Sequence, residues 1–109
     1  MRSGFDDREK GFEAKFSHDE DLKFRVRAHR DKLLGLWAAH ASGLVGAAAE
    51  AYADELVAAD VGHPRDDFLA DRILADAAAR GAALDLRAVR REMRRLAETA
   101  RIDVMIGRK

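Results

Sequence analysis

The chain has 109 residues and a mass of 12.1 kDa, which suits one ordinary domain and is too small for a two-domain cofactor enzyme. Its 20 Lys and Arg residues balance 20 Asp and Glu residues, so it lacks the net basic field of a general nucleic-acid or membrane-surface binder. The absence of cysteine excludes disulfides, thiolate nucleophiles and cysteine-ligated metal sites. Short apolar runs, few aromatic residues and a single proline predict an all-α protein with neither a transmembrane span nor a signal peptide.

The zero net charge is unevenly distributed along the chain. Residues 1–32 contain nine Lys and Arg against eight Asp and Glu, residues 33–85 contain three against nine, and residues 86–109 contain eight against three. An acidic middle and a basic tail attract each other when they are packed together, or else they face different partners. We favour the first arrangement, in which oppositely charged helices fold into one neutral bundle.

Residues 1–17 are the first segment in chain order. Phe5, Phe12 and Phe16 are seven and four residues apart, so they share one face if the segment is helical. The charged residues between them and Gly11 leave few apolar anchors and a weak intrinsic helicity. We expect a mobile, potentially helical segment that either docks in a groove of a partner or packs back onto the rest of the chain.

The first helix of the following region, residues 18–109, is predicted at about 18–42. Ser17 and Glu20 have the spacing of a capping box, in which each side chain bonds the other residue's backbone N–H, so this helix is expected to begin near His18. Apolar and histidine side chains recur at steps of three and four residues and predict its buried stripe: Leu22, Val26, His29, Leu33, Leu36 and His40, with Trp37 and Ala41 beside it.

Three shorter helices are predicted next, at about 46–61, 65–80 and 86–105. Gly43 and Gly46 bracket the first turn, Pro64 is placed to open the second of these helices, Gly81 to stop it, and Asp85 to cap the last. Their apolar stripes are Val45, Ala48, Ala49, Tyr52, Leu56 and Ala59; then Leu69, Ile73 and Ala77; then Leu86, Val89, Met93, Leu96, Ala97, Ala100 and Val104. Four helices with short links predict a compact four-helix bundle.

The sequence contains no recognisable catalytic or metal-binding motif. His18, His29 and His40 recur every eleven residues, but successive imidazoles on a helix at that spacing are roughly 16 Å apart along the axis and cannot share one ion. HExxH, GxSxG, GxGxxG and the phosphate-binding loop are absent. The arginine-rich face of the last helix is either solvated, paired with the acidic middle or an anion grip: Arg87, Arg90, Arg91, Arg94 and Arg95. We therefore predict a protein that is not an enzyme and needs no cofactor or metal.

Two blocks of sequence resemble those of a known family. They are FDDREKGFEAKF at residues 5–16 and KLLGLWAA at residues 32–39, and the similarity continues through Gly46, Tyr52-Ala53 and Asp60. In these blocks the chain is similar to the zeta-subunit family of alphaproteobacterial F-type ATP synthase inhibitors. The resemblance implies a four-helix bundle whose mobile N-terminal segment inserts into the catalytic head of the ATP synthase, between catalytic and central-stalk subunits, and blocks ATP hydrolysis.

The resemblance also implies two sets of binding residues. In the inhibitory segment, Phe5, Phe12 and Phe16 are the expected anchors, with a polar rim of Arg8, Lys10, Glu13 and Lys15. Members of the family bind ADP or ATP on the bundle, although this chain has Leu44-Val45 where the family's glycine pair often encloses Lys-Thr. The residues expected to hold a nucleotide lie near the junction of the first two helices: Arg30, Lys32, Trp37 and Tyr52.

The predicted function is regulatory inhibition of an F-type ATP synthase by a cytoplasmic protein that is monomeric when free. It would reach the inner membrane only through the ATP synthase, without inserting into the membrane and without a nucleic-acid partner. The alternative is a helical sensor or adaptor module that binds ADP or ATP as a regulatory ligand and does not inhibit the enzyme directly.

Overall fold

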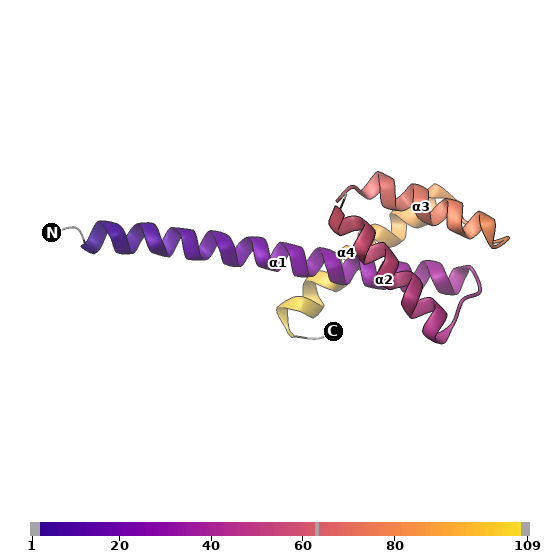
Figure 1. Cartoon of the computed structure of the whole chain (residues 1–109), viewed down its shortest axis with the longest axis horizontal. Helices are drawn as coiled ribbons and strands as arrows, with labels where there is room; N and C mark the ends of the chain where they lie inside the picture. Colours follow the sequence, from indigo (N-terminus) through magenta and orange to yellow (C-terminus); the bar gives the residue numbers. More distant parts are fainter. Residues whose placement is uncertain (1–2, 63, 108–109) are drawn as a thin grey trace.

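The structure is a computed structural model that describes residues 3–62 and 64–107, with side chains described from residue 18 onward (Figure 1). It contains four helices in chain order: α1 (Ser3–Ala41), α2 (Gly46–Gly62), α3 (Asp66–Ala79) and α4 (Leu86–Met105). No strand occurs in the described residues. The predicted all-α class with four helices is therefore confirmed.

α1 is the central helix of the fold. Its C-terminal half packs against α2 and α4, and α3 closes the bundle by packing on α4, α1 and, to a smaller extent, α2. The N-terminal half of α1 extends beyond the other three helices (Figure 1). A single helix thus belongs to the bundle at one end and leaves it at the other.

The start of α1 differs from the prediction. The helix expected to begin near His18 instead begins at Ser3 and passes through Ser17 without interruption. No proline interrupts residues 3–17, and Gly11 destabilises the helix by only about 1 kcal/mol relative to alanine. A helix that extends from a packed neighbour needs no new nucleus, so this penalty does not stop it. The predicted mobility of residues 1–17 stays a prediction.

The other three helices have bounds within one residue of those predicted. Asp85 caps α4 as expected, because its Oδ1 accepts a hydrogen bond from the backbone N–H of Ala88 at 2.8 Å. Gly43 and Gly81 follow α1 and α3 with φ of +90° and +78°, a conformation that glycine adopts without strain. The capping residue of α4 and the glycines that follow α1 and α3 are therefore at the positions that the sequence predicts.

Pro64 does not open α3 as predicted. Arg65 is the N-cap residue, in an extended conformation with φ of −135° and ψ of 124°, and the first helical residue is Asp66. An N-cap residue lies outside the helical region of backbone space, so the proline is two positions too early to be the first helical residue. Asp66 and Asp67 then occupy the first turn, where the helix dipole favours carboxylates.

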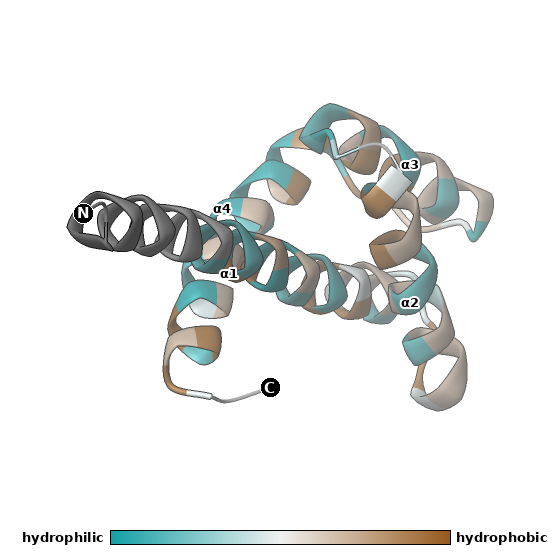
Figure 2. Cartoon of the chain, turned by 60° about the vertical axis from the view of Figure 1, so that its left-hand side comes forward, coloured by the Kyte–Doolittle hydropathy of each residue, from teal (hydrophilic) through white to brown (hydrophobic). Residues whose placement is uncertain are grey.

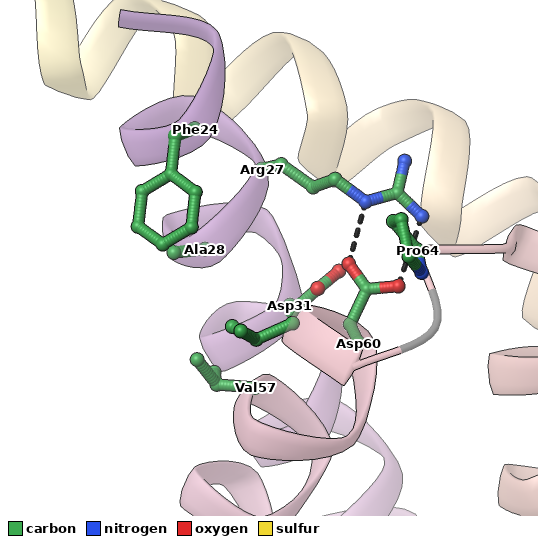
Figure 3. A pocket seen from close by; sticks show the side chains of 8 residues that line it. Phe24, Arg27, Ala28, Asp31, Val57, Asp60 and Pro64 are labelled. Carbon is green, nitrogen blue, oxygen red and sulfur yellow. Dashed lines mark hydrogen bonds and ion pairs between the residues drawn. The ribbon is translucent and has the colours of Figure 1, made fainter. Parts of the chain in front are cut away.

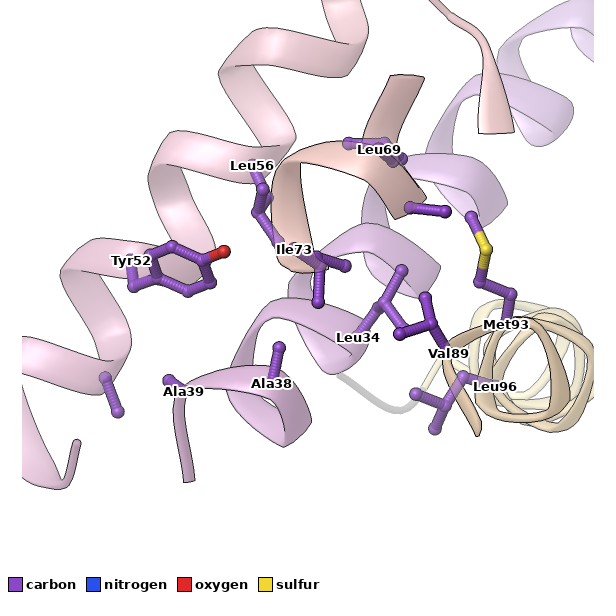
Figure 4. Packing of buried hydrophobic residues seen from close by; sticks show 12 residues of the cluster. Leu34, Ala38, Ala39, Tyr52, Leu56, Leu69, Ile73, Val89, Met93 and Leu96 are labelled. Carbon is purple, nitrogen blue, oxygen red and sulfur yellow. The ribbon is translucent and has the colours of Figure 1, made fainter. Parts of the chain in front are cut away.

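The hydrophobic core forms where side chains from all four helices meet (Figure 4). Its largest fully buried apolar side chains are Leu34 from α1, Leu56 from α2, Leu69 and Ile73 from α3, and Val89 from α4. The predicted stripe of α3 and most of the predicted stripe of α4 lie in this core. Three residues of the stripes predicted for the three shorter helices are instead exposed: Val45, Ala48 and Leu86.

The predicted stripe of the first helix is not its most buried face. Leu22, Val26, Leu33 and Leu36 are only half-buried and His40 is exposed, whereas the fully buried face holds Arg30, Asp31, Leu34, Ala38 and Ala39. Apolar periodicity assigns charged residues to the solvent side, so it selected the neighbouring face of this helix. The buried face could be identified only once the structure showed which side chains pair with its charged residues.

α1 and α2 come into close contact at Gly35. A Cβ atom at this position would lie 2.6 Å from Cα of Ala53 and 2.9 Å from its Cβ. Both separations are shorter than van der Waals contact, so a larger residue would force the helices apart. Gly35 thus sets the distance between the two helices.

Candidate functional site

An ionic cluster holds α1 against α2 and α3 at the point where α1 leaves the bundle (Figure 1), and Figure 3 shows its residues Arg27, Asp31 and Asp60. We call this cluster the ionic clamp; it consists of Arg27, Arg30, Asp31, Asp60 and Asp66. Arg27 donates hydrogen bonds from Nε and Nη2 to the two carboxylate oxygens of Asp60. Arg27 Nη2 and Arg30 Nη1 lie 3.0 and 2.9 Å from Asp66 Oδ1, and Arg30 Nη2 donates to Asp31 Oδ1 at 2.7 Å. Three helices are therefore joined through two guanidinium groups.

Burial sets the protonation of the clamp. Asp31, Asp60 and Arg30 are 1%, 3% and 7% exposed. Burial raises the pKa of Asp31 to about 7, and its hydrogen bond with Asp60 acts in the same direction, against the Arg30 guanidinium. Burial acts to raise the pKa of Asp60 too, but hydrogen bonds from Arg27 and Asp31 outweigh it and lower that pKa. Of the two carboxyl groups, Asp31 thus has the raised pKa and Asp60 the lowered one.

The described part of α1 that precedes the clamp is surrounded largely by solvent. Every residue from His18 to Phe24 is exposed except Leu22, and Phe24 is 58% exposed. Its ion pairs are local: Lys23 Nζ lies 3.5 Å from Glu20 Oε1, and Arg25 Nε lies 3.3 Å from Asp21 Oδ2. Exposed pairs of this kind contribute about 0.5 kcal/mol or less. This stretch therefore has little in its own chain to pack against.

The predicted inhibitory residues lie in the same half of α1, closer to its N-terminus: Phe5, Arg8, Lys10, Phe12, Glu13, Lys15 and Phe16. The backbone is helical from Ser3 onward, which places the three phenylalanines at the spacing of a single helical face. Their side chains lie outside the described residues, so their binding role stays a prediction.

Two of the predicted nucleotide-binding residues are cations of α1 that point to different helices. Arg30 belongs to the ionic clamp and reaches α3. Lys32 reaches α2, where its Nζ lies 2.7 Å from both Glu50 Oε2 and Asp54 Oδ1, and these hydrogen bonds raise the Lys32 pKa. Both cations therefore already have carboxylate partners within the bundle.

The other two predicted nucleotide-binding residues are aromatic and pack in the bundle. Trp37 is partly buried and lies against the core. The Tyr52 hydroxyl donates to Asp76 Oδ2 at 2.8 Å, and the Arg80 guanidinium lies 5.1 Å from the centre of the Tyr52 ring. Burial and the Asp76 contact raise the Tyr52 pKa. The four residues are thus not gathered at one point, and their role with a nucleotide stays a prediction.

Two grooves run beside α1 where α4 crosses it. The larger has a volume of about 560 Å³ and combines an apolar floor with the side chains of Arg25, Lys32 and His29; it is lined by Phe24, Arg25, Ala28, His29, Lys32, Leu33, Leu36, Val104 and Gly107. Each of these three side chains has a carboxylate neighbour, since His29 Nε2 lies 2.9 Å from Asp103 Oδ2 and the pairs of Arg25 and Lys32 are described above. Of the predicted nucleotide-binding residues, only Lys32 lines this groove.

The acidic middle of the chain pairs mainly with α1 and not with the basic tail. Carboxylates of α2 and α3 reach Arg27, Arg30 and Lys32, as described above. Among the described side chains, one ion pair joins α3 to α4, between Asp67 Oδ1 and Arg90 Nη2 at 3.2 Å. The helices do fold into one bundle as predicted, but the main ion-pair partner of the acidic middle is α1 and not the basic tail, because α1 lies between α2 and α4 and supplies nearer cations.

No spacing of charged residues along the sequence predicts the ionic clamp. Asp60 lies 33 residues from Arg27, and Asp66 lies 39 residues away, so no local spacing connects them. The one local signal is the pair of opposite charges at Arg27 and Asp31, four residues apart, which is common on solvated helices.

Within the described chain, no helix is long and apolar enough to cross a membrane.

Comparison with known proteins gives one finding about the whole arrangement. The model of a protein family described as ATPase inhibitor subunit zeta matches residues 1–103. The match includes all of α1, the ionic clamp and most of α4. No match is found among curated proteins or among solved structures.

Proposed function

The chain belongs to the ATPase inhibitor subunit zeta family, and we propose that it inhibits ATP hydrolysis by an F-type ATP synthase by inserting residues 1–17 into the catalytic head. A family of inhibitor subunits consists of regulators and not of catalysts. The observation that supports the N-terminal route is the form of α1, one helix from Ser3 to Ala41 that is clamped by part-buried ion pairs behind an exposed stretch. The helix to be inserted and the helix that anchors it are the same element.

The length of α1 suits this action. The part before the clamp, residues 3–26, is roughly 36 Å long at 1.5 Å per residue. Extension from a packed helix costs less ordering free energy than folding an isolated segment, so residues 1–17 would enter a groove at a reduced entropic cost. Bending the helix at its base would disturb the Arg27–Asp60 and Arg30–Asp66 pairs, which join α1 to α2 and α3. The ionic clamp therefore opposes bending of α1 relative to the bundle.

In the proposed complex, the helix lies between catalytic and central-stalk subunits and stops rotation in the hydrolytic direction. Phe5, Phe12 and Phe16 bury their rings in the groove, and Arg8, Lys10, Glu13 and Lys15 fix the register at its rim. The free protein would be a cytoplasmic monomer that meets the membrane only through the enzyme.

The test measures ATP hydrolysis by the cognate ATP synthase with the full chain, with Phe12→Ala and with a variant that lacks residues 1–17. We expect Phe12→Ala to weaken inhibition by about tenfold or more, as loss of an aromatic anchor does, and the deletion to abolish it. Phe24→Ala is the matched control, because Phe24 is an exposed phenylalanine on the same helix outside the segment. It should leave inhibition within about twofold of wild type.

Helical circular dichroism and thermal unfolding of each variant show whether the bundle remains folded. A folded deletion variant that inhibits as strongly as the full chain would exclude the N-terminal route. An equal loss for Phe12→Ala and Phe24→Ala would place the contact on α1 as a whole and contradict a boundary near residue 17.

A second candidate function is binding of ADP or ATP by the bundle as a regulatory ligand. The larger groove favours it, because about 560 Å³ is within the range of small-molecule sites and its apolar floor is rimmed by Arg25, His29 and Lys32. Phosphates would have to displace the carboxylates that pair with these cations. Titration with ADP, followed by amide chemical shifts, should move the signals of His29 and Lys32. Shifts confined to Trp37 and Tyr52 would place the nucleotide at the junction of α1 and α2, and no shifts at millimolar ADP would exclude this function.

A further inference from the structure

The outer face of α4 carries three arginines that have no carboxylate partner among the described side chains, and we propose that they dock on an acidic surface of the ATP synthase that the chain inhibits. We call Arg87, Arg91 and Arg94 the arginine stripe; all three are exposed. The proposal rests on the proposed function and deepens it. It gives the bundle a contact of its own, separate from the N-terminal segment.

The stripe differs from most other cations in the described chain, which are paired. Nine of those cations have a carboxylate oxygen within 4.0 Å: Lys23, Arg25, Arg27, Arg30, Lys32, Arg72, Arg90, Arg95 and Arg101. Two of them, Arg95 and Arg101, are exposed on α4 itself and pair with Glu92 and Glu98 of the same helix. The guanidinium groups of the stripe are thus left for solvent or for another molecule.

The stripe is a straight row on one side of the helix. Arg87, Arg91 and Arg94 are four and three residues apart, so they share one face over roughly 10 Å of helix axis. The buried residues of α4 lie on the opposite face, among them Val89, Met93 and Leu96. Figure 2 shows that hydrophilic and hydrophobic residues alternate along the ribbon of α4. The stripe therefore points away from the core.

This arrangement is unfavourable for the helix alone. Arg87 is in the first turn of α4, where the helix dipole disfavours a cation, and no acidic residue occurs in that turn. Arg87 and Arg91 are like charges four residues apart, and Arg91 and Arg94 are like charges three residues apart; both spacings bring the guanidinium groups together. Among the described side chains, no ion pair relieves this repulsion, and such a local conflict is typical of a functional surface.

The rest of α4 favours an acidic protein surface over a lipid surface. A helix that lies in a membrane interface needs a continuous free apolar face. The apolar face of α4 that holds Val89, Met93 and Leu96 is buried in the bundle, and the exposed apolar residues Leu86, Ile102 and Met105 lie at the two ends of the helix. The planar guanidinium group pairs in a fixed geometry with carboxylates, and a short rigid row of such groups fits a matching row on a folded protein. The partner is thus expected to present several Asp or Glu side chains along about 10 Å.

The experiment measures the rate at which the full chain associates with the cognate ATP synthase, at about 50 mM and about 200 mM salt. In Arg91→Gln/Arg94→Gln we expect an association rate about tenfold lower at low salt, with a much weaker salt dependence. The matched control is Arg65→Gln/Arg80→Gln, which removes the same charge from exposed positions at the two ends of α3. It should keep the wild-type rate within about twofold. Equal rates and salt dependence for the two double variants would overturn the proposal.

Two further measurements separate the outcomes. Loss of binding to vesicles containing anionic phosphatidylglycerol in Arg91→Gln/Arg94→Gln, with unchanged association with the enzyme, would overturn the proposal and assign the stripe to a membrane. Phe12→Ala in the same association assay separates the stripe from the segment. If Phe12→Ala abolishes inhibition and the stripe variant behaves as wild type, only the stripe proposal fails. If Phe12→Ala inhibits normally and the stripe variant associates slowly, the N-terminal route fails and the stripe proposal stands.

Discussion

The two ends of the described part of α1 contain similar residues in different surroundings. Between residues 18 and 24 the helix is charged and exposed, and its ion pairs are formed within the helix. From Arg27 onward it is also charged, but Arg30 and Asp31 are buried, because Asp60 and Asp66 approach from α2 and α3. The difference teaches that charge on a helix does not decide exposure. What decides it is whether opposite charges arrive from other helices.

The largest expected effect compares two leucines of α1. Leu34 is fully buried, so Leu34→Ala should lower the free energy of unfolding by about 3 kcal/mol through lost apolar contact and a cavity. Leu22 is half-buried on the exposed stretch, so Leu22→Ala should cost about 1 kcal/mol or less. Urea unfolding followed by circular dichroism measures both. Equal losses would mean that the two stretches of α1 are packed alike.

The next effect compares ion pairs. Asp60→Ala removes the buried carboxylate that binds Arg27, and we expect a loss of about 2 kcal/mol, since Arg27 is part-exposed and keeps Asp66 as a partner. Glu20→Ala breaks the exposed pair with Lys23 and should change the unfolding free energy by about 0.5 kcal/mol or less. Chemical unfolding at low and high salt provides the measurement. A loss for Asp60→Ala no larger than that for Glu20→Ala would show that the ionic clamp does not hold α1.

A smaller effect tests the close approach of α1 and α2. Gly35→Ala places a methyl group 2.6 Å from Cα of Ala53, and the resulting displacement should outweigh the higher helix propensity of alanine and cost about 1–2 kcal/mol. Gly62 is the matched control, because it is also helical and has open space around the position of a Cβ. Gly62→Ala should be neutral or slightly stabilising. Thermal unfolding of the two variants gives the comparison, which fails if Gly35→Ala is the more stable.

The smallest effect is a pH dependence within the ionic clamp. The pKa of Asp31 is about 7 in the folded chain and near 3.8 when unfolded, so between these values the folded state binds more protons. The unfolding free energy should therefore decrease as pH rises from about 4 to about 7. Asp31→Asn keeps a donor toward Asp60 and an acceptor for Arg30, and should flatten this decrease by about 1 kcal/mol between pH 5 and 8. Identical slopes for the variant and the wild type would show that Asp31 stays charged.

Sequence patterns predicted what depends on neighbours within a few residues. The bounds of α2, α3 and α4, the cap at Asp85 and the glycine ends at Gly43 and Gly81 follow from local hydrogen bonding and backbone preference. The core residues Leu69 and Ile73 of α3 follow from simple helical periodicity. Local signals failed at Ser17, because a capping box permits a helix to begin but does not end the one that precedes it.

Sequence patterns predicted only part of the candidate site. The phenylalanine spacing and the resemblance pointed to residues 1–17 as a partner-binding segment, and this role stays a prediction; the family match supports the function only at the level of an ATPase inhibitor. The ionic clamp was not predicted, and neither was the pairing of the acidic middle mainly with α1. Both depend on which of several charged helices become neighbours, and the spacing of charges along one chain does not contain that information.

The sequence by itself thus determined the helices, most of their ends, the family and the segment that carries the proposed inhibition. These properties depend on short-range backbone and side-chain preferences and on the order of residues. Only the tertiary structure decided which face of α1 is buried, how Asp31 and Asp60 share a proton, and which arginines of α4 remain without a partner. The reason is physical: the energy of a charged group depends on burial and on opposite charges within a few ångströms, and both are set by helices that lie far apart in the chain.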